Sequence, residues 1–360
     1  MRVLLSVAEL AAGGAERIVV ELANALDARG EEICVAGDTG PFDRLLEGSR
    51  IERRLIPGRG RSPVTAVRAT RRLRAATRAF RPDLVHAHNV KATGIAAIGR
   101  VGTRGRRVSL LATFHGVRRE EYRRAAAVLR QADFVVCVSQ DLLEGLASSG
   151  LPRDRTRVIR NAVPLAEPLA QAARQRIDRE LGLEGRSVVS LVGRLVPQKA
   201  PQRFLEAAAR VAAAEPECTF LVVGDGPLRD SLGALSRRLG VAERVRFTGV
   251  RGDARELIAR SDVVAFSSEW EGMPVAGLEA LAAGVPVVST DVEGARELLA
   301  DGPGVVVPRA TEPLADAVID LLRAPSLRAE MGRHGRQRIA SDFSVERMVG
   351  AYRELYLELT

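Results

Sequence analysis

The segment VVAFSSEWEGMPVAGLEALAAGVPVVSTD, residues 263–291, places two short apolar runs on either side of a helical stretch. The runs Val263–Ser267 and Pro286–Ser289 are rich in valine and predict strands. Between them, Pro274 suits the first turn of a helix that continues through Leu281. A strand, a helix and a second strand in this order are typical of a βαβ unit in a parallel sheet.

The same alternation of short apolar runs and longer helical stretches recurs along all 360 residues. This length exceeds what one hydrophobic core usually serves, so we predict two α/β domains with parallel sheets. In the first half the predicted strands are Val3–Val7, Ile33–Ala36, Leu84–Ala87, Val108–Thr113, Phe134–Ser139 and Val158–Ile159. In the second half they are Val188–Val192, Thr219–Val223, Val245–Thr248, Val263–Ser267, Pro286–Ser289 and Val305–Val307.

The boundary between the halves is predicted in NAVPLAEPLAQAA, which starts at Asn161. Pro164 and Pro168 interrupt both the helical and the strand periods there, as in an interdomain linker. We therefore expect domains at 1–163 and 164–342, followed by a terminal segment 343–360 that carries a helix.

Composition and charge narrow the class of protein. The chain is 46% hydrophobic, no apolar run approaches the ~20 residues of a membrane span, and the N-terminus lacks a signal-peptide cleavage site. Cys34, Cys137 and Cys218 lie far apart in apolar stretches, which predicts buried, reduced thiols and a cytoplasmic protein. The whole chain has a formal charge of +9, whereas residues 1–165 alone carry +12. That excess either reflects a general arginine bias or attracts an anionic partner, and the partner we favour is an inner membrane surface, with no nucleic acid.

In the first half, two loops that follow predicted strands carry candidate binding residues. Gly13 and Gly14 precede a helix that begins near Glu16, and they allow a phosphate or sugar to approach the backbone, although a simple turn would also use glycine. The loop lacks the GxGxxG spacing of dinucleotide-binding proteins. His115 follows a strand and could bind a hydroxyl or move a proton, or serve only in structure. His86 and His88 could share a metal, but no third ligand follows at a recognisable spacing, and an ordinary strand end is the favoured interpretation.

In the second half, the loop GRLVPQK opens at Gly193 and presents Arg194 and Lys199. Two permanent cations beside a helix start are suited to neutralise a departing diphosphate. Lys199 is notable because 52 of the 54 basic residues are arginine, although a solvated loop charge is the alternative. Gly226 lies in a tight GDGP turn, and Val250 follows a strand whose end could read the edge of a nucleobase.

The segment 263–291 holds two further acidic candidates. Glu271 lies in the loop before the helix, and Glu279 lies about one turn into it. Glu279 could accept hydrogen bonds from ribose hydroxyls while Glu271 binds a sugar. A solvated pair is the alternative, but the helix is otherwise almost entirely apolar, so a charge in it needs a partner.

These motifs together resemble family 4 of the retaining glycosyltransferases, over essentially the whole chain. The most specific motif is the pair of glutamates in EGMPVAGLE, Glu271 and Glu279. The other matching motifs are GGAER, the HG after a strand, GRLVPQK, GDGP and the closing FSVERMVGAYRELY, all in the expected order. Three departures are Ala162 in NAV where NGV is usual, Ala200 in place of the Gly of QKG, and the loop EGMPVAGLE in place of the commoner EGFGLPVLE.

The resemblance implies the GT-B fold, in which two Rossmann-like domains face each other across a cleft and the terminal helix crosses back to the first domain. It implies a nucleotide-sugar donor, with UDP preferred over GDP, a hydroxyl acceptor that we hypothesise to be lipid-linked, and no metal or other cofactor. Arg194 and Lys199 would bind the diphosphate and Glu279 the ribose. Glu271 and the backbone of Gly272, Met273 and Pro274 would hold the sugar, which His115 would also contact. Gly13 and Gly14 would lie beside the phosphates and the acceptor.

Other functions remain open alternatives. A nucleotide-sugar epimerase of the same fold would need no acceptor, and a phosphorylase would have a longer chain with a cofactor lysine. An NAD-dependent oxidoreductase would need the GxGxxG fingerprint. A non-catalytic protein that binds anionic lipid could use the arginine-rich stretch 68–78, but it would not need Arg194, Lys199, Glu271 and Glu279 together.

Overall fold

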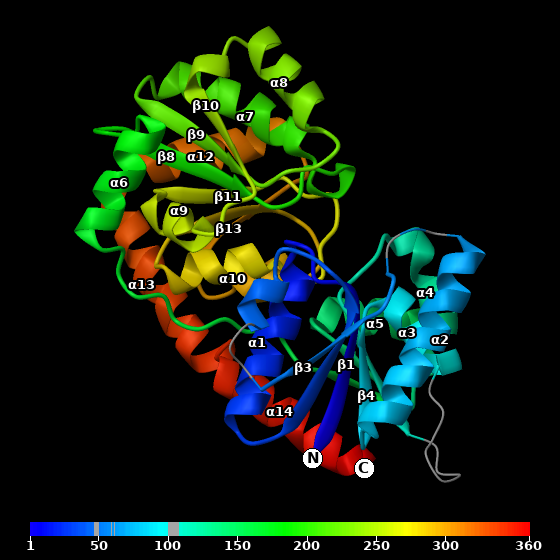
Figure 1. Ribbon diagram of the computed structural model, residues 1–360. Coiled ribbons are helices and arrows are strands. Elements are labelled where there is room, and N and C mark those ends of the chain that lie inside the picture. The colour runs from blue at the N-terminus through cyan, green and yellow to red at the C-terminus, as the bar shows by residue number, and fades with distance from the viewer. Residues whose placement is uncertain (47–49, 59, 61, 100–107) are drawn as a thin grey trace. The chain divides into compact units, whose positions relative to one another are not determined.

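The computed structural model describes residues 1–46, 50–58, 60, 62–99 and 108–360. They form two compact units (Figure 1). Unit 1 comprises Met1–Ala162 and Val345–Thr360, and unit 2 comprises Val163–Ser344. No helix in the described ranges is both long enough and apolar enough to cross a membrane.

Unit 1 is built on a seven-stranded sheet with the order β3-β2-β1-β4-β5-β6-β7, in which every neighbouring pair is parallel. Its central strands are almost fully buried, as expected for a parallel sheet covered by helices on both faces. The strands are β1 (Arg2–Glu9), β2 (Glu32–Asp38), β3 (Glu52–Leu55), β4 (Leu84–His88), β5 (Ser109–Phe114), β6 (Phe134–Cys137) and β7 (Thr156–Val158).

Strand β3 was not among the strands predicted from the sequence. Its four residues, Glu52, Arg53, Arg54 and Leu55, include three charges and show no apolar alternation. It lies at the edge of the described sheet, where it pairs with β2 and its side chains are half-buried or exposed. Charged residues are common on edge strands because they discourage pairing with other chains. The same charges make the segment resemble a loop, and the strand was therefore not predicted.

The helices of unit 1 come from both of its chain segments. Helix α14 follows all of unit 2 in sequence, yet it packs against α1. Its apolar side includes the buried residues Met348, Val349, Tyr352, Leu355 and Tyr356. The helices are α1 (Gly14–Ala28), α2 (Pro63–Phe80), α3 (Val90–Gly99), α4 (Tyr122–Leu129), α5 (Gln140–Ser148) and α14 (Val345–Leu359).

Unit 2 has a six-stranded parallel sheet with the order β10-β9-β8-β11-β12-β13. All six strands were predicted, and each observed end differs from the prediction by at most one residue. The reason is the dense run of valine and other branched residues in each strand, which suits a sheet buried on both faces. The strands are β8 (Ser187–Val192), β9 (Cys218–Val223), β10 (Val245–Gly249), β11 (Val263–Phe266), β12 (Val287–Thr290) and β13 (Gly304–Val307).

Eight helices of unit 2 cover its sheet, among which α7 packs on α12 and α10 packs on α13. They are α6 (Gln171–Leu181), α7 (Pro201–Ala214), α8 (Arg229–Arg238), α9 (Ala254–Arg260), α10 (Val275–Ala282), α11 (Ala295–Leu299), α12 (Thr311–Arg323) and α13 (Pro325–Asp342). The cysteines of both units are free and buried, as predicted, and burial raises the pKa of Cys34, Cys137 and Cys218 to about 12.

Candidate functional site

The order of strands identifies the loops where a ligand is expected. In unit 2 the chain runs outward from β8 through β9 to β10, then returns to the other side of β8 with β11. Ligands of doubly wound sheets bind at such a reversal, outside the carboxyl ends of the two strands. The loops in question follow β8 and β11, and they carry Arg194, Lys199 and Glu271.

Lys199 and Glu271 meet at this reversal although 72 residues separate them in sequence. Lys199 ends a short 3-10 helix, Pro197–Lys199, and its Nζ donates to Oε1 of Glu271 over 2.5 Å. The Ser268 hydroxyl donates to the same oxygen over 2.6 Å. The Glu271 side chain is only 7% exposed, so its charge depends on these two donors.

Both bonds end on Oε1 of Glu271, and the bond from Lys199 uses one of its three ammonium protons. Hydrogen-bonding groups therefore remain for a ligand. In the described chain, Glu271 Oε2 has no partner, and Lys199 has two further donors that no protein group accepts. The site can therefore accept hydrogen bonds at Oε2 of Glu271 and donate two from Nζ of Lys199 at an adjacent position.

Backbone and side-chain hydrogen bonds hold these two loops together. The Ser267 hydroxyl bonds the carbonyl oxygens of Lys199 and Ala200, each over 2.9 Å. Gln198 bonds the Trp270 carbonyl over 3.1 Å and accepts from the Glu269 amide over 2.8 Å. Because both loops are fixed in this way, Lys199 and Glu271 are held in position before a ligand binds.

The glycines of the neighbouring turns are explained by close loop packing. A Cβ atom on Gly224 would lie 2.0 Å from the Gly193 carbonyl oxygen, and one on Gly226 would lie 2.5 Å from that of Leu195. A Cβ atom on Gly193, where φ is +152°, would lie 3.3 Å from Cε of Lys199. Gly193 thus leaves room for the lysine side chain, while Gly224 and Gly226 let the loops after β8 and β9 touch.

Helix α10 begins beside Glu271 without a side-chain cap. Pro274 is its N-cap residue, so the helix starts one residue later than predicted, at Val275. The amides of Val275 and Ala276 have no acceptor among the described residues. Gly272 is covered by Gly294, on which a Cβ atom would lie 2.2 Å from the Gly272 carbonyl oxygen. The free amides and the helix dipole favour an anion or a polar oxygen at this point.

Glu279 has the partner that its apolar helix requires. Its Oε1 accepts from Nε of Arg255 on α9 over 2.8 Å, and its side chain is 13% exposed. No bond to Lys199 or Arg194 is found for it in the described chain. Nothing in the sequence indicated Arg255, because the pair joins two different helices.

Three other predicted residues of unit 2 lie in or near these loops. The Arg194 guanidinium is exposed and has no partner within the described ranges. Met273 is buried, and Val250 is 55% exposed just after β10. The strand end before Val250 is already occupied on one side, because the Gly249 carbonyl accepts the Gly224 amide over 2.9 Å. An exposed valine at this place offers an apolar surface that a flat ring could cover.

In unit 1 the strand order reverses between β1 and β4, so the loops after these strands are the equivalent place. Gly13, in extended conformation, is the N-cap of α1, and Gly14 is exposed. A Cβ atom on Gly13 would meet only the end of the Glu16 side chain, which can move. The fold itself therefore does not demand glycine at position 13.

A cluster of imidazole and hydroxyl groups lies at the ends of β4 and β5. His86 bonds Tyr356 through Nδ1 and Thr113 through Nε2, both over 2.7 Å, and Thr113 bonds Tyr352 over 3.0 Å. Nδ1 of His88 lies 3.2 Å from Nε2 of His115. Sequence reasoning missed both tyrosines, although their spacing of four on the terminal helix places them on one face.

Burial keeps these imidazoles neutral. It lowers the pKa of His86 to about 3 and that of His115 to about 4, and it lowers the pKa of His88 well below its usual range. The neighbouring imidazoles lower the pKa of His86 and His88 further. No group of three or more His, Cys, Asp or Glu residues suited to a metal occurs in the part of the chain that is described.

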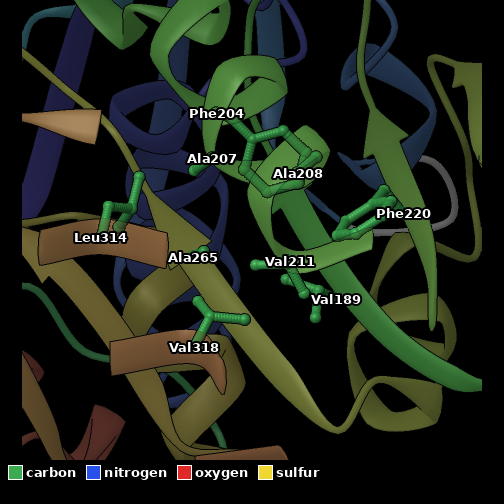
Figure 2. Close-up of a pocket in the computed structure, with 9 residues that line it drawn as sticks. All are labelled: Val189, Phe204, Ala207, Ala208, Val211, Phe220, Ala265, Leu314 and Val318. Carbon is green, nitrogen blue, oxygen red and sulfur yellow. The ribbon is translucent and has the colours of Figure 1, made fainter. Parts of the chain in front are cut away.

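An apolar crevice in unit 2 is a separate feature. Figure 2 shows it among α7, α12 and the sheet, with Phe204 and Phe220 on one side and Leu314 and Val318 on the other. The nine residues that line it offer no polar side chain, and none of them belongs to the predicted site. It is part of the core and not a site for a nucleotide or a sugar.

Comparison with known proteins identifies the family. A model of the glycosyl transferases group 1 matches residues 173–338, and a model of Glycosyltransferase Family 4 matches residues 12–167. The chain is 30% identical to the lipopolysaccharide core biosynthesis glycosyltransferase LpsE of Rhizobium meliloti over 358 residues, which is 95% of each chain. The chain belongs to glycosyltransferase family 4.

A second relative and a solved structure are also similar to the chain. The chain is 33% identical to the alpha-D-kanosaminyltransferase of Streptomyces kanamyceticus over 195 residues, about half the length of each. It superposes on HepE of Anabaena in complex with UDP-glucose with a TM-score of 0.88, over all of both chains and at 24% identity. The structural match confirms the predicted α/β fold with two Rossmann-like units of the GT-B class. The protein is a glycosyltransferase that takes its sugar from a nucleotide-sugar.

Proposed function

We propose that this enzyme transfers a sugar from a UDP-sugar to a hydroxyl acceptor, with retention of the anomeric configuration and without a metal ion. The observation that carries the proposal is the meeting of Lys199, Glu271 and the uncapped start of α10 at the strand reversal of unit 2. A cation, a free carboxylate oxygen and free amides are the groups that a diphosphate with an attached sugar needs.

Each residue has a role in this proposal. Arg194 and Lys199 bind the diphosphate, and Glu279 binds the ribose beside its Arg255 partner. Glu271 accepts a hydrogen bond from a sugar hydroxyl through Oε2, the oxygen that the described residues leave free. Gly193, Gly226 and Val250 border the nucleotide. The remaining roles follow the family resemblance. Gly272, Met273 and Pro274 hold the sugar through their backbone, His115 contacts the sugar, and Gly13 and Gly14 lie beside the phosphates and the acceptor.

The proposed reaction is a substitution on one face of the sugar. The acceptor oxygen forms a bond to the anomeric carbon as the bond from that carbon to the diphosphate breaks. The acceptor proton passes to an oxygen of the leaving diphosphate, whose growing negative charge Arg194 and Lys199 neutralise. Two protein cations supply this counter-charge, and we therefore propose a reaction that needs no metal.

The choice of UDP has support from the relatives. HepE was solved with UDP-glucose and with UDP, and the name of an Escherichia coli galactosyltransferase, 28% identical over 306 residues, specifies UDP-Gal and a diphosphoundecaprenol acceptor. GDP is the second candidate, because a mannosyltransferase of Mycolicibacterium smegmatis that matches 46% of the chain uses GDP-mannose by name.

We further propose a lipid-linked acceptor, reached from an anionic inner membrane surface by a cytoplasmic enzyme. Helix α2 supports this, because it contains no acidic residue and exposes Val64 and Val67 beside its arginines. None of these guanidinium groups has a partner among the residues described. The arginines are Arg68, Arg71, Arg72, Arg74 and Arg78. A basic helix face with apolar residues suits a surface of anionic lipid.

Turnover of a UDP-sugar in the presence of EDTA tests the proposal. We expect product that retains the anomeric configuration, and we expect Lys199→Ala and Glu279→Ala each to reduce kcat/KM at least about ten-fold, which corresponds to ~1.4 kcal/mol of lost transition-state stabilisation. Release of an altered sugar without any acceptor would instead indicate an epimerase. Normal activity of both variants would contradict the proposed donor site.

Two controls separate binding from folding. Lys199→Ala leaves the buried Glu271 carboxylate without its cation, which by itself can cost ~3–5 kcal/mol of stability. The double variant Lys199→Met with Glu271→Gln removes both charges, so it should regain stability while turnover stays low. Arg238→Ala, an exposed arginine on α8, should keep wild-type turnover.

A further inference from the structure

The cluster in unit 1 contains one fully buried polar atom for which the described residues offer no partner. Nε2 of His88 is buried, and no donor or acceptor among the described residues reaches it. The His88 ring is 4.1 Å from the ring of His86, centroid to centroid, and 5.5 Å from that of His115. His88 is therefore a neighbour of both of the other imidazoles.

Hydroxyl groups hold the ring of His86. Tyr356 and Thr113 bond the two nitrogens of His86, and Tyr352 bonds Thr113. Hydroxyls can both donate and accept, so either tautomer of His86 is satisfied. His86 therefore packs against His88 but does not determine which of its nitrogens carries the proton.

The bond between His88 and His115 permits only two arrangements when both rings are neutral. In one, Nδ1–H of His88 donates to Nε2 of His115, and the orphaned Nε2 of His88 is a bare acceptor. In the other, His115 donates, and His88 must bury an N–H group that has no acceptor. Buried orphan donors are the rarer kind in proteins, so the first arrangement is favoured.

We infer that His88 is a positioning residue that fixes His115 as the tautomer protonated on Nδ1, so that His115 presents an N–H donor to a ligand oxygen. Nδ1 of His115 has no partner in the described chain, and this side chain is only partly buried. The inference rests on the proposed contact of His115 with the donor sugar. The ligand group it selects is an oxygen that accepts a hydrogen bond, such as a sugar hydroxyl oxygen.

This assignment also limits what His115 can do in the reaction. A nitrogen that already carries a proton cannot remove one from the acceptor hydroxyl. His115 then orients the sugar, and the leaving diphosphate takes the proton, as in the proposed substitution. His88 acts on the substrate only through the bond to His115.

Nitrogen-15 NMR of the intact chain tests the tautomer without any substrate. The chain has four histidines, and His334→Gln removes the one outside the cluster and so simplifies the assignment. We expect correlations that show a proton on Nδ1 of His115 and on Nδ1 of His88. A proton on Nε2 of His115 would overturn the inference, whatever the enzyme's activity.

A pair of variants tests the consequence for turnover. In His88→Asn the amide nitrogen replaces Nδ1 as donor, whereas His88→Leu fills similar space without one. We expect kcat/KM to fall about ten-fold or more in the leucine variant, with mixed His115 tautomers, and the asparagine variant to restore most of that loss and the single tautomer. Equal losses in both variants, with His115 still protonated on Nδ1, would overturn it.

The two proposals fail in different ways. Full activity of His115→Phe would contradict the contact with the sugar, and with it the functional part of this inference. That result would leave the NMR signature of His115 in the wild-type protein unchanged.

Discussion

Ala200 adopts a left-handed backbone conformation, with φ of 41° and ψ of 51°, directly after Lys199. The family pattern has glycine at this position, and the structure shows the reason. The chain must turn sharply between the 3-10 helix that carries Lys199 and the start of α7 at Pro201. For alanine, this left-handed conformation is about 1–2 kcal/mol less stable than the right-handed helical conformation. This backbone strain lies next to Lys199, the residue proposed to bind the diphosphate, and it results from the sharp turn.

We expect Ala200→Gly to stabilise unit 2 by up to about 1 kcal/mol, because glycine adopts positive φ without strain and loses only some entropy. Urea unfolding followed by fluorescence measures this effect in unit 2, since Trp270 is the single tryptophan of the chain. Ala209→Gly, within α7, is the matched control and should destabilise by about 1 kcal/mol. A loss of stability in both variants would contradict the strain at Ala200.

At the scale of elements, strands β4 and β5 and helix α14 enclose a cluster of neutral histidines. His86 is fully buried and lies between hydroxyls of Tyr356 and Thr113. Because burial lowers the pKa of His86 to about 3 and that of His115 to about 4, the unfolded chain binds more protons than the folded one below pH ~6.5. The stability of unit 1 is therefore coupled to pH.

We expect the free energy of unfolding of unit 1 to decrease as the pH falls from about 6.5 to 5, by up to ~1.4 kcal/mol per pH unit for each of these histidines. Tyrosine circular dichroism reports on unit 1, because Tyr122, Tyr352 and Tyr356 all belong to it. The slope should be shallower in His115→Gln, with His334→Gln as the control for loss of a histidine. Stability that rises as the pH falls through this window would contradict the neutral cluster.

At the scale of the whole molecule, charge is divided unequally along the chain. Residues 1–165 carry a formal charge of +12 and the whole chain carries +9, so residues 166–360 are slightly acidic. Much of the positive charge lies on the arginines of α2. Exposed charges of this kind act over about 10 Å at 0.1 M salt, which makes any attraction to a charged surface sensitive to ionic strength.

We expect the protein to sediment with vesicles of anionic lipid at low salt, and to be released as the salt concentration rises. Arg71→Glu with Arg74→Glu should weaken binding, because both lie on the exposed part of α2. Arg237→Glu with Arg238→Glu makes the same change in net charge on α8 of unit 2 and should bind like the wild type. Equal binding of all three proteins, or none at low salt, would contradict the proposed surface.

Sequence reasoning predicted elements better than contacts. The strands of unit 2 were found because each is a run of branched apolar residues, whereas β3 escaped notice because Glu52, Arg53 and Arg54 resemble a solvated loop. Lys199 and Glu271 were both singled out, but their direct bond joins loops 72 residues apart, and no local pattern encodes it. The bond of His86 to Tyr356 spans 270 residues and depends on the same kind of tertiary information.

The position of α14 has a consequence for synthesis of the protein. A ribosome translates residues 1–162 first, then all of unit 2, and only then the helix that places Tyr352 and Tyr356 beneath β4 and β5. Until that helix emerges, the nascent chain holds an incomplete first core with His86 lacking its tyrosine. Unit 2 is continuous in sequence, so we expect it to complete its fold before unit 1, although most of unit 1 is translated first.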